Sequence, residues 1–124
     1  MEAPLATRTS NPPFLNGVPE LLILRLLSQR AMYGYELVQT IKLASAGELE
    51  FGEGCVYPIL HRLEGDRLLK ASEQAVGART RIVYETTARG RARLAESIST
   101  WERISQAINH ALQGGAHGPA AVAR

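Results

Sequence analysis

The fold of this 124-residue chain is decided by the stretch Val56-Tyr57-Pro58-Ile59-Leu60-His61-Arg62-Leu63-Glu64. Its apolar residues follow the i, i+3, i+4, i+7 spacing of one buried helical face: Val56, Ile59, Leu60 and Leu63. Because proline has no backbone N–H, Pro58 fits a helix only in its first turn, so this helix should begin close to Gly54. The stretch therefore predicts a helix with an apolar core side and an outer side that carries a phenol, an imidazole and a guanidinium.

Two further helices are predicted before this stretch. The first follows a candidate cap at Asn16-Gly17, has Pro19 in its first turn and is dominated by leucines over residues 21–27. A helix that is apolar on most sides is central in its domain or shared with a partner subunit. The second helix is expected from Tyr33 to Ala46, where a glycine follows and ends it.

A hairpin and a long helix are predicted after the same stretch. Residues 68–73 and the β-branched run 81–86 flank a glycine-containing turn, which is typical of two short antiparallel strands. Thr87 can then cap a last helix from Ala88 to about Gln113. This element order predicts a mainly α fold with a small β-hairpin: a winged helix-turn-helix followed by a C-terminal dimerisation helix.

The predicted elements divide the chain into four parts. Residues 1–13 contain three prolines among small and polar residues and are expected to form a flexible arm, while residues 114–124 are expected to form a disordered tail. Residues 14–87 make up the predicted DNA-binding domain, and residues 88–113 the dimerisation helix. A chain of this length builds only a small core, which favours pairing with a second copy.

The charge is small in total and uneven in distribution. The formal net charge is only +2, yet five arginines stand against one acid between Arg79 and Arg93. Such a local basic stretch suits a polyanion, although a solvated charged surface is the commoner meaning of an arginine run. The three arginines at the start of the last helix face the positive end of its dipole, so a solvated position is expected for them: Arg89, Arg91 and Arg93.

Element order alone is weak support for a function, so the prediction depends on the side chains that this fold would present to DNA. The residues expected to contact DNA lie on the second helix, the third helix and the hairpin: Tyr35, Gly54, Tyr57, Pro58, His61, Arg62, Arg79 and Arg81. The two hairpin arginines are expected to meet phosphates. Alternatives stay open, because Tyr35 could be a packing residue of the second helix, Tyr57 could instead pack against the hairpin and His61 could simply be solvated.

Three motifs resemble the PadR family of transcriptional regulators. They occur in the family's order and spacing, and the resemblance covers residues 15–112: Tyr33-Gly34-Tyr35-Glu36-Leu37, Val56 to Glu64, and Tyr84-Glu85-Thr86-Thr87-Ala88-Arg89-Gly90. The resemblance implies a DNA-binding, usually repressing, homodimer whose C-terminal helix crosses to the other subunit. A single C-terminal helix resembles the short-tailed branch of the family, whereas Gly65-Asp66-Arg67 departs from the acidic pair and glycine that are common there.

The last predicted helix carries an apolar stripe at alternating intervals of three and four residues: Leu94, Ile98, Trp101, Ile104, Ile108 and Leu112. This stripe is too long for a small winged domain to cover, so we expect it to pack against the first helix and the same stripe of a second subunit. Trp101 lies midway along it, where a planar ring near a two-fold axis could line a cavity for a small aromatic effector. The alternative is that Trp101 belongs only to the interface core.

Other classes of function find little support in the sequence. It has no phosphate-binding loop, nucleophile elbow, acid/base pair or metal-ligand spacing, so no enzyme, cofactor or metal is expected. Cys55 is the single cysteine, which excludes an intrachain disulfide. A lone cysteine at such a position is more often a small packing residue than a redox-sensitive thiolate. Without a signal peptide or membrane span, a cytoplasmic location is expected. The alternative function is a winged-helix module that binds proteins and not DNA.

Overall fold

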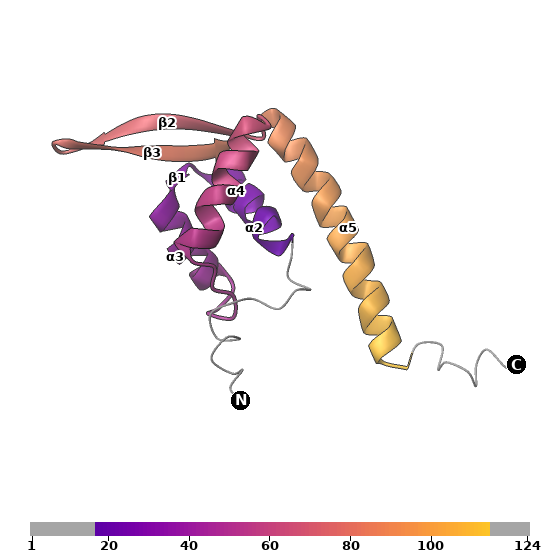
Figure 1. Ribbon diagram of the computed structural model, residues 1–124. Helices are drawn as coiled ribbons and strands as arrows, with labels where there is room; N and C mark the ends of the chain where they lie inside the picture. Colours follow the sequence, from indigo (N-terminus) through magenta and orange to yellow (C-terminus); the bar gives the residue numbers. More distant parts are fainter. Residues whose placement is uncertain (1–16, 115–124) are drawn as a thin grey trace, which may run out of the picture. The chain divides into compact units, whose positions relative to one another are not determined.

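Three helices of the computed structural model surround the core of the first part of the chain: α2 (Val18–Gln29), α3 (Gly34–Ala44) and α4 (Glu53–Gly65) (Figure 1). The structure describes residues 17–114, and the expected arm 1–13 and the expected tail beyond residue 114 lie outside them. Helix α2 is central, as its leucine-rich sequence predicts, since Ile23, Leu24 and Leu27 are at most 1% exposed.

A small antiparallel sheet completes this core, with β1 (Met32–Tyr33), β2 (Leu69–Val76) and β3 (Arg79–Thr86) in the order β1-β3-β2. The hairpin of β2 and β3 is the predicted wing. It is longer than predicted, because Gly77 and one further residue alone join the two strands. Gly77 has a φ of 62° while the residue after it has a negative φ, which is the backbone of a type II′ hairpin turn.

Strand β1 was not predicted from the sequence. It holds only two residues, too few for a strand period to be recognised, and its pairing is with the distant strand β3: Met32 lies opposite Tyr84 and Tyr33 opposite Val83. Because side chains alternate along a strand, Met32 and Tyr84 share the core face and Tyr33 lies on the other face. The short strand therefore fixes the root of the wing beside the start of α3.

Helix α4 begins where the sequence places it, but Pro58 does not lie in the first turn. The helix starts at Glu53 after the cap residue Gly52, so Pro58 is its sixth residue. The expectation about Pro58 is therefore wrong. Proline at this position removes the hydrogen bond to the carbonyl of Gly54, and the helix tolerates the loss because both residues are exposed and water can reach that carbonyl.

Helix α5 (Ala88–Leu112) begins with the predicted cap, as Thr87 Oγ1 accepts a hydrogen bond from the backbone N–H of Gly90 at 3.0 Å. Gly90 must be glycine, because a Cβ there would overlap the backbone carbonyl of Leu68. The described residues divide into a first unit that ends at Leu94 and a second that begins at Ala95. No helix within residues 17–114 is long and apolar enough to cross a membrane.

The fold class predicted from the sequence is confirmed: a mainly α fold with a winged hairpin and a C-terminal helix. A buried polar contact ties the hairpin to the central helix, because Thr86, which is 4% exposed, donates a hydrogen bond from Oγ1 to the carbonyl of Leu24 at 2.9 Å. Tyr84 is buried beside it on β3. Burial, followed by the nearby Glu64 and Tyr57, raises the pKa of the Tyr84 phenol.

Candidate nucleic-acid interface

The outer side of α4 presents a line of small or polar residues at intervals of four, three and four. Gly54, Pro58, His61 and Gly65 are all exposed, whereas Val56, Leu60 and Leu63 on the other side are 0% exposed. Three residues predicted to contact DNA thus share one surface line. Because glycine has no side chain and proline has a compact one, this line would let the α4 backbone come close to a nucleic acid.

Tyr57 flanks the outer line of α4 and is half-buried against the start of α3. Its ring occupies the space that a Cβ on Gly34 would need, so Gly34 makes room for it. The ring centroids of Tyr57 and His61 are 6.3 Å apart with a 49° angle between the planes. Tyr57 therefore packs within the domain, but against α3 and not against the hairpin as the alternative expected. It also lies next to the exposed His61.

Arg62 flanks the same line from the other side, and its guanidinium is already engaged. Its Nη2 donates to Oε1 of Glu20 at 3.0 Å, and the Arg62 side chain remains 52% exposed. Glu20 was not recognised as a site residue, since nothing in the local sequence relates the first turn of α2 to the last turn of α4. The contact depends on packing between distant parts of the chain.

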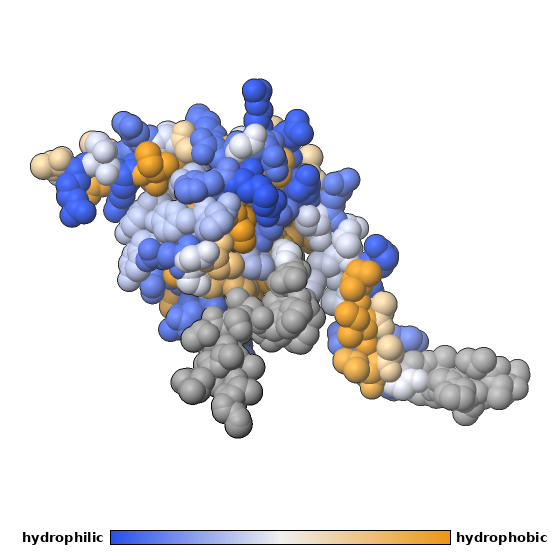
Figure 2. Space-filling view, in the orientation of Figure 1, coloured by the Kyte–Doolittle hydropathy of each residue, from blue (hydrophilic) through white to orange (hydrophobic). Residues whose placement is uncertain are grey.

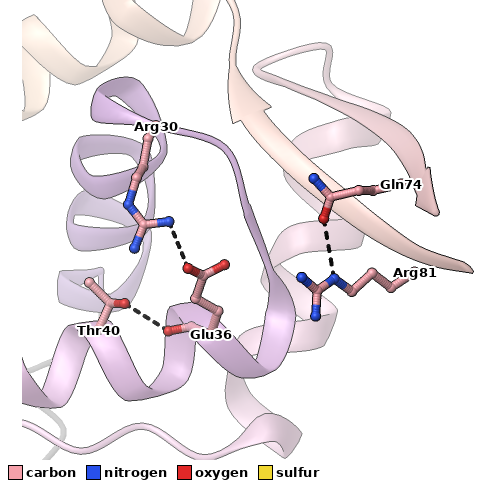
Figure 3. Close-up of polar contacts among 5 residues, drawn as sticks. All are labelled: Arg30, Glu36, Thr40, Gln74 and Arg81. Atoms are coloured by element: carbon pink, nitrogen blue, oxygen red, sulfur yellow. Dashed lines mark hydrogen bonds and ion pairs between the residues drawn. The ribbon is translucent and has the colours of Figure 1, made fainter. Parts of the chain in front are cut away.

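The two wing arginines differ in their surroundings. Arg79 is exposed directly beside the turn, where it pairs with Val76. Arg81 lies two residues further in, with its guanidinium carbon 3.8 Å from the centre of the Tyr33 ring and its Nε donating to Oε1 of Gln74 at 3.3 Å (Figure 3). Arg79 thus extends toward solvent at the wing tip, whereas Arg81 also braces the wing against β1.

This difference predicts unequal effects of two alanine variants. Arg79→Ala should reduce the slope of log affinity for DNA against log salt by about 0.9, the value for one lost phosphate contact. Arg81→Ala should change this slope by less than half as much and should lower the stability by about 0.5–1 kcal/mol, because it loses the stacking on Tyr33. Fluorescence anisotropy at several salt concentrations measures the slope, and thermal melts measure the stability. Equal slopes and equal melting temperatures in the two variants would contradict the different roles of Arg79 and Arg81.

Tyr35 is the remaining predicted DNA contact, and it is 51% exposed in the first turn of α3. Beside it, Glu36 accepts a hydrogen bond from Nη1 of Arg30 at 2.6 Å, and the backbone carbonyl of Glu36 accepts one from Thr40 Oγ1 at 2.8 Å (Figure 3). Tyr35 therefore lies in a helix turn in which the charge of the neighbouring Glu36 is balanced by Arg30. Hydrophilic side chains prevail on the face of this unit in view in Figure 2.

All three arginines at the start of α5 are exposed, as expected, and two of them also make hydrogen bonds at the surface. Arg91 Nη2 donates to the carbonyl of Ser28 at 3.0 Å, and Arg93 Nη1 donates to Oε2 of Glu20 at 3.3 Å. Arg91 thus meets the last turn of α2, where carbonyl groups have no helical partner, and Arg93 meets an acid in its first turn. These two arginines therefore connect the first two turns of α5 with α2 through exposed contacts.

Cys55 sits in the first turn of α4 and is half-buried. Burial raises the pKa of its thiol. A raised pKa is the reverse of what a redox-sensitive thiolate requires, so the packing role is favoured. Within residues 17–114 no group of three or more histidine, cysteine or acidic side chains is arranged to hold a metal ion.

The apolar stripe of α5 is exposed over most of its length. Trp101 is 49% and Leu112 is 78% exposed, Ile104 and Ile108 are exposed between them, and Figure 2 shows this apolar strip toward the end of the helix. Leu94 differs, because it is only 6% exposed and packs within its own chain. The expected seam should therefore begin at Ile98, which is half-buried, and not at Leu94.

Comparison with known proteins gives one consistent result. The sequence profile of the transcriptional regulator PadR-like family matches residues 23–96, which is more than half of the chain. A transcriptional regulator of Mycobacterium tuberculosis is 33% identical over 95 residues, covering 77% of this chain and 86% of that protein.

Solved structures agree with the sequence comparison. A PadR-like transcriptional regulator from Bacillus cereus is 32% identical with a TM-score of 0.72, covering 83% of this chain and 99% of that one. A PadR family transcriptional regulator from Eggerthella lenta is 29% identical with a TM-score of 0.70, covering 80% and 85% of the two chains. The similarity thus extends over nearly all of the first solved chain and most of the second.

Proposed function

Because the chain belongs to the PadR-like family of transcriptional regulators, we propose that it is a repressor that binds an inverted-repeat operator as a homodimer and is released by a small aromatic compound. Regulators of this family bind DNA and are not enzymes. The proposed site of action is the cytoplasm, where the operator DNA would be reached. The proposal needs no cofactor.

The observation that carries DNA binding is the exposed line on α4, formed by Gly54, Pro58 and His61 between the flanking Tyr57 and Arg62. An imidazole and a guanidinium can donate to base edges and phosphates, and the small residues around them allow close approach of the helix. The arginine at the wing tip adds a positive charge that can meet a phosphate. Together these groups offer both sequence-reading and phosphate contacts.

The observation that supports a homodimer is the apolar strip on α5, because large apolar side chains in a helical row are seldom left in water. A second apolar surface lies on the first unit, in a groove between α2 and α3 lined by Leu22, Leu26 and Ile41. A helix shared with a partner subunit was one of the two expectations for the leucine-rich α2. Two copies could therefore cover one another's apolar surfaces.

Selection of duplexes from a random-sequence library tests the proposed function. The protein should enrich an inverted repeat whose half-sites are about 10 bp apart or a multiple of that distance, since a two-fold dimer places two reading helices one helical turn apart. Enrichment of no sequence at all, with a partner protein captured instead, would favour the alternative of a winged module that binds only proteins.

Trp101 is the residue proposed to meet the aromatic effector. Its indole is half exposed midway along the α5 strip, and in a dimer a flat compound could stack on it. Planar aromatic compounds should therefore quench Trp101 fluorescence in a saturable way and weaken operator binding by about tenfold, a coupling common between two ligand sites. The chain has a single tryptophan, so the signal has one source.

The matched control for Trp101 is Trp101→Phe, which keeps an apolar ring at the interface and should retain the dimer while it weakens the response of operator binding to the compound. A broad panel of planar compounds that leaves both the fluorescence and the operator affinity unchanged would assign Trp101 to interface packing alone.

A further inference from the structure

The carboxylate of Glu20 lies between two arginines that come from different helices. Its Oε1 accepts a hydrogen bond from Arg62 at 3.0 Å, and its Oε2 accepts one from Arg93 at 3.3 Å. Glu20 lies in the first turn of α2, Arg62 in the last turn of α4 and Arg93 in the second turn of α5. One acid is thus shared by the proposed DNA-reading helix and the start of α5.

The three side chains differ in exposure. Glu20 is 20% exposed, whereas Arg62 is 52% and Arg93 is 44% exposed. A largely buried carboxylate needs a charged partner, because leaving it unpaired away from water is unfavourable. Arg93 can keep this role when Arg62 moves away. The arrangement therefore allows Arg62 to leave without stranding the charge of Glu20.

On the basis of the proposed function, we propose that Glu20 determines DNA specificity: it holds Arg62 in complexes with random-sequence DNA and releases it only at the operator. The arginine side of this ion pair is 52% exposed, so the pair is weak, and a well-oriented contact between arginine and a base edge is stronger than it. A contact between Arg62 and a loosely placed phosphate is not stronger than its ion pair with Glu20. Glu20 therefore removes one cationic contact from the sequence-independent part of binding.

The variant Glu20→Gln tests this proposal on a random-sequence duplex. It should raise the affinity about three- to tenfold at low salt and steepen the slope of log affinity against log salt by about 0.9, since Arg62 becomes available to a phosphate. The affinity for the operator should change less, so the ratio of operator to random affinity should fall several-fold. In the double variant Glu20→Gln/Arg62→Gln, both the gain and the steeper slope should disappear.

Glu36→Gln is the matched control, because it makes the same change in net charge. Glu36 pairs with Arg30 in much the same setting, with side-chain exposures of 29% and 58% (Figure 3). A gain in Glu20→Gln that is no larger than in Glu36→Gln would overturn the proposal, and so would a gain that survives the loss of Arg62. Neither outcome could be explained by a carboxylate that restrains this one arginine.

A second variant guards against loss of the fold. Glu20→Asp keeps the charge but shortens the side chain by one methylene, so it should steepen the slope in the same direction and by a smaller amount. The proposed function and the role of Glu20 can be contradicted separately. A wild-type protein without preference for any operator would contradict the proposed function, whereas a preference that persists unchanged in Glu20→Gln would contradict only the role of Glu20.

Discussion

The double variant Ile98→Asp/Ile108→Asp should sediment as a monomer at concentrations where the wild-type protein sediments as a dimer. Both residues lie on the apolar strip of α5, and Ile108 is 53% exposed within one chain. An aspartate in an apolar interface would have to lose its hydration without a partner, so two of them should abolish association. Operator affinity should fall at least about 100-fold, because the two half-sites would no longer be bound by linked subunits.

The control places two aspartates on the opposite side of the same helix. Ser99→Asp/Gln106→Asp introduces the same charge at exposed positions away from the strip. It should leave the dimer intact and reduce operator affinity only slightly, through added negative charge. A stable dimer in Ile98→Asp/Ile108→Asp would remove the proposed seam, and equal effects of the two double variants would assign the loss to charge alone.

The second large effect is expected at Tyr57. Tyr57→Ala should weaken operator binding about 10- to 100-fold and lower the free energy of unfolding by about 2 kcal/mol, because the half-buried ring packs against Gly34 as well as bordering the proposed DNA surface. Tyr57→Phe keeps the ring and should leave stability nearly unchanged while it weakens operator binding about three- to tenfold.

Thermal melts and anisotropy titrations on the two Tyr57 variants separate packing from contact. If Tyr57→Phe binds the operator as well as the wild type, the hydroxyl does not contact DNA and the residue acts through packing. If Tyr57→Ala also keeps wild-type operator affinity, the proposed reading surface on α4 is wrong.

The fold was predictable because its decisive signals are local. The apolar spacing of Val56, Leu60 and Leu63, the cap at Thr87 and the glycine at the hairpin turn each act through neighbours in the sequence. Strand β1 was missed because two residues carry no recognisable period and their pairing partner lies on β3. The prediction that Pro58 lies in the first turn was wrong because an exposed second turn tolerates the lost hydrogen bond.

The candidate site was predictable in part, for the same physical reason. The spacing within α4 indicates which of its residues share a face, so the line through Gly54, Pro58 and His61 could be anticipated. The partners of the flanking residues could not. Tyr57 meets Gly34, and Arg62 meets Glu20, across contacts that only tertiary packing brings together.

The most direct test of the account compares wild-type binding to the selected inverted repeat and to a scrambled duplex of equal length over a range of salt concentrations. We expect one dimer per repeat, much tighter binding to the repeat than to the scrambled duplex, and a logarithm of affinity that falls linearly with the logarithm of the salt concentration. Equal affinity for both duplexes, or binding that does not respond to salt, would contradict it.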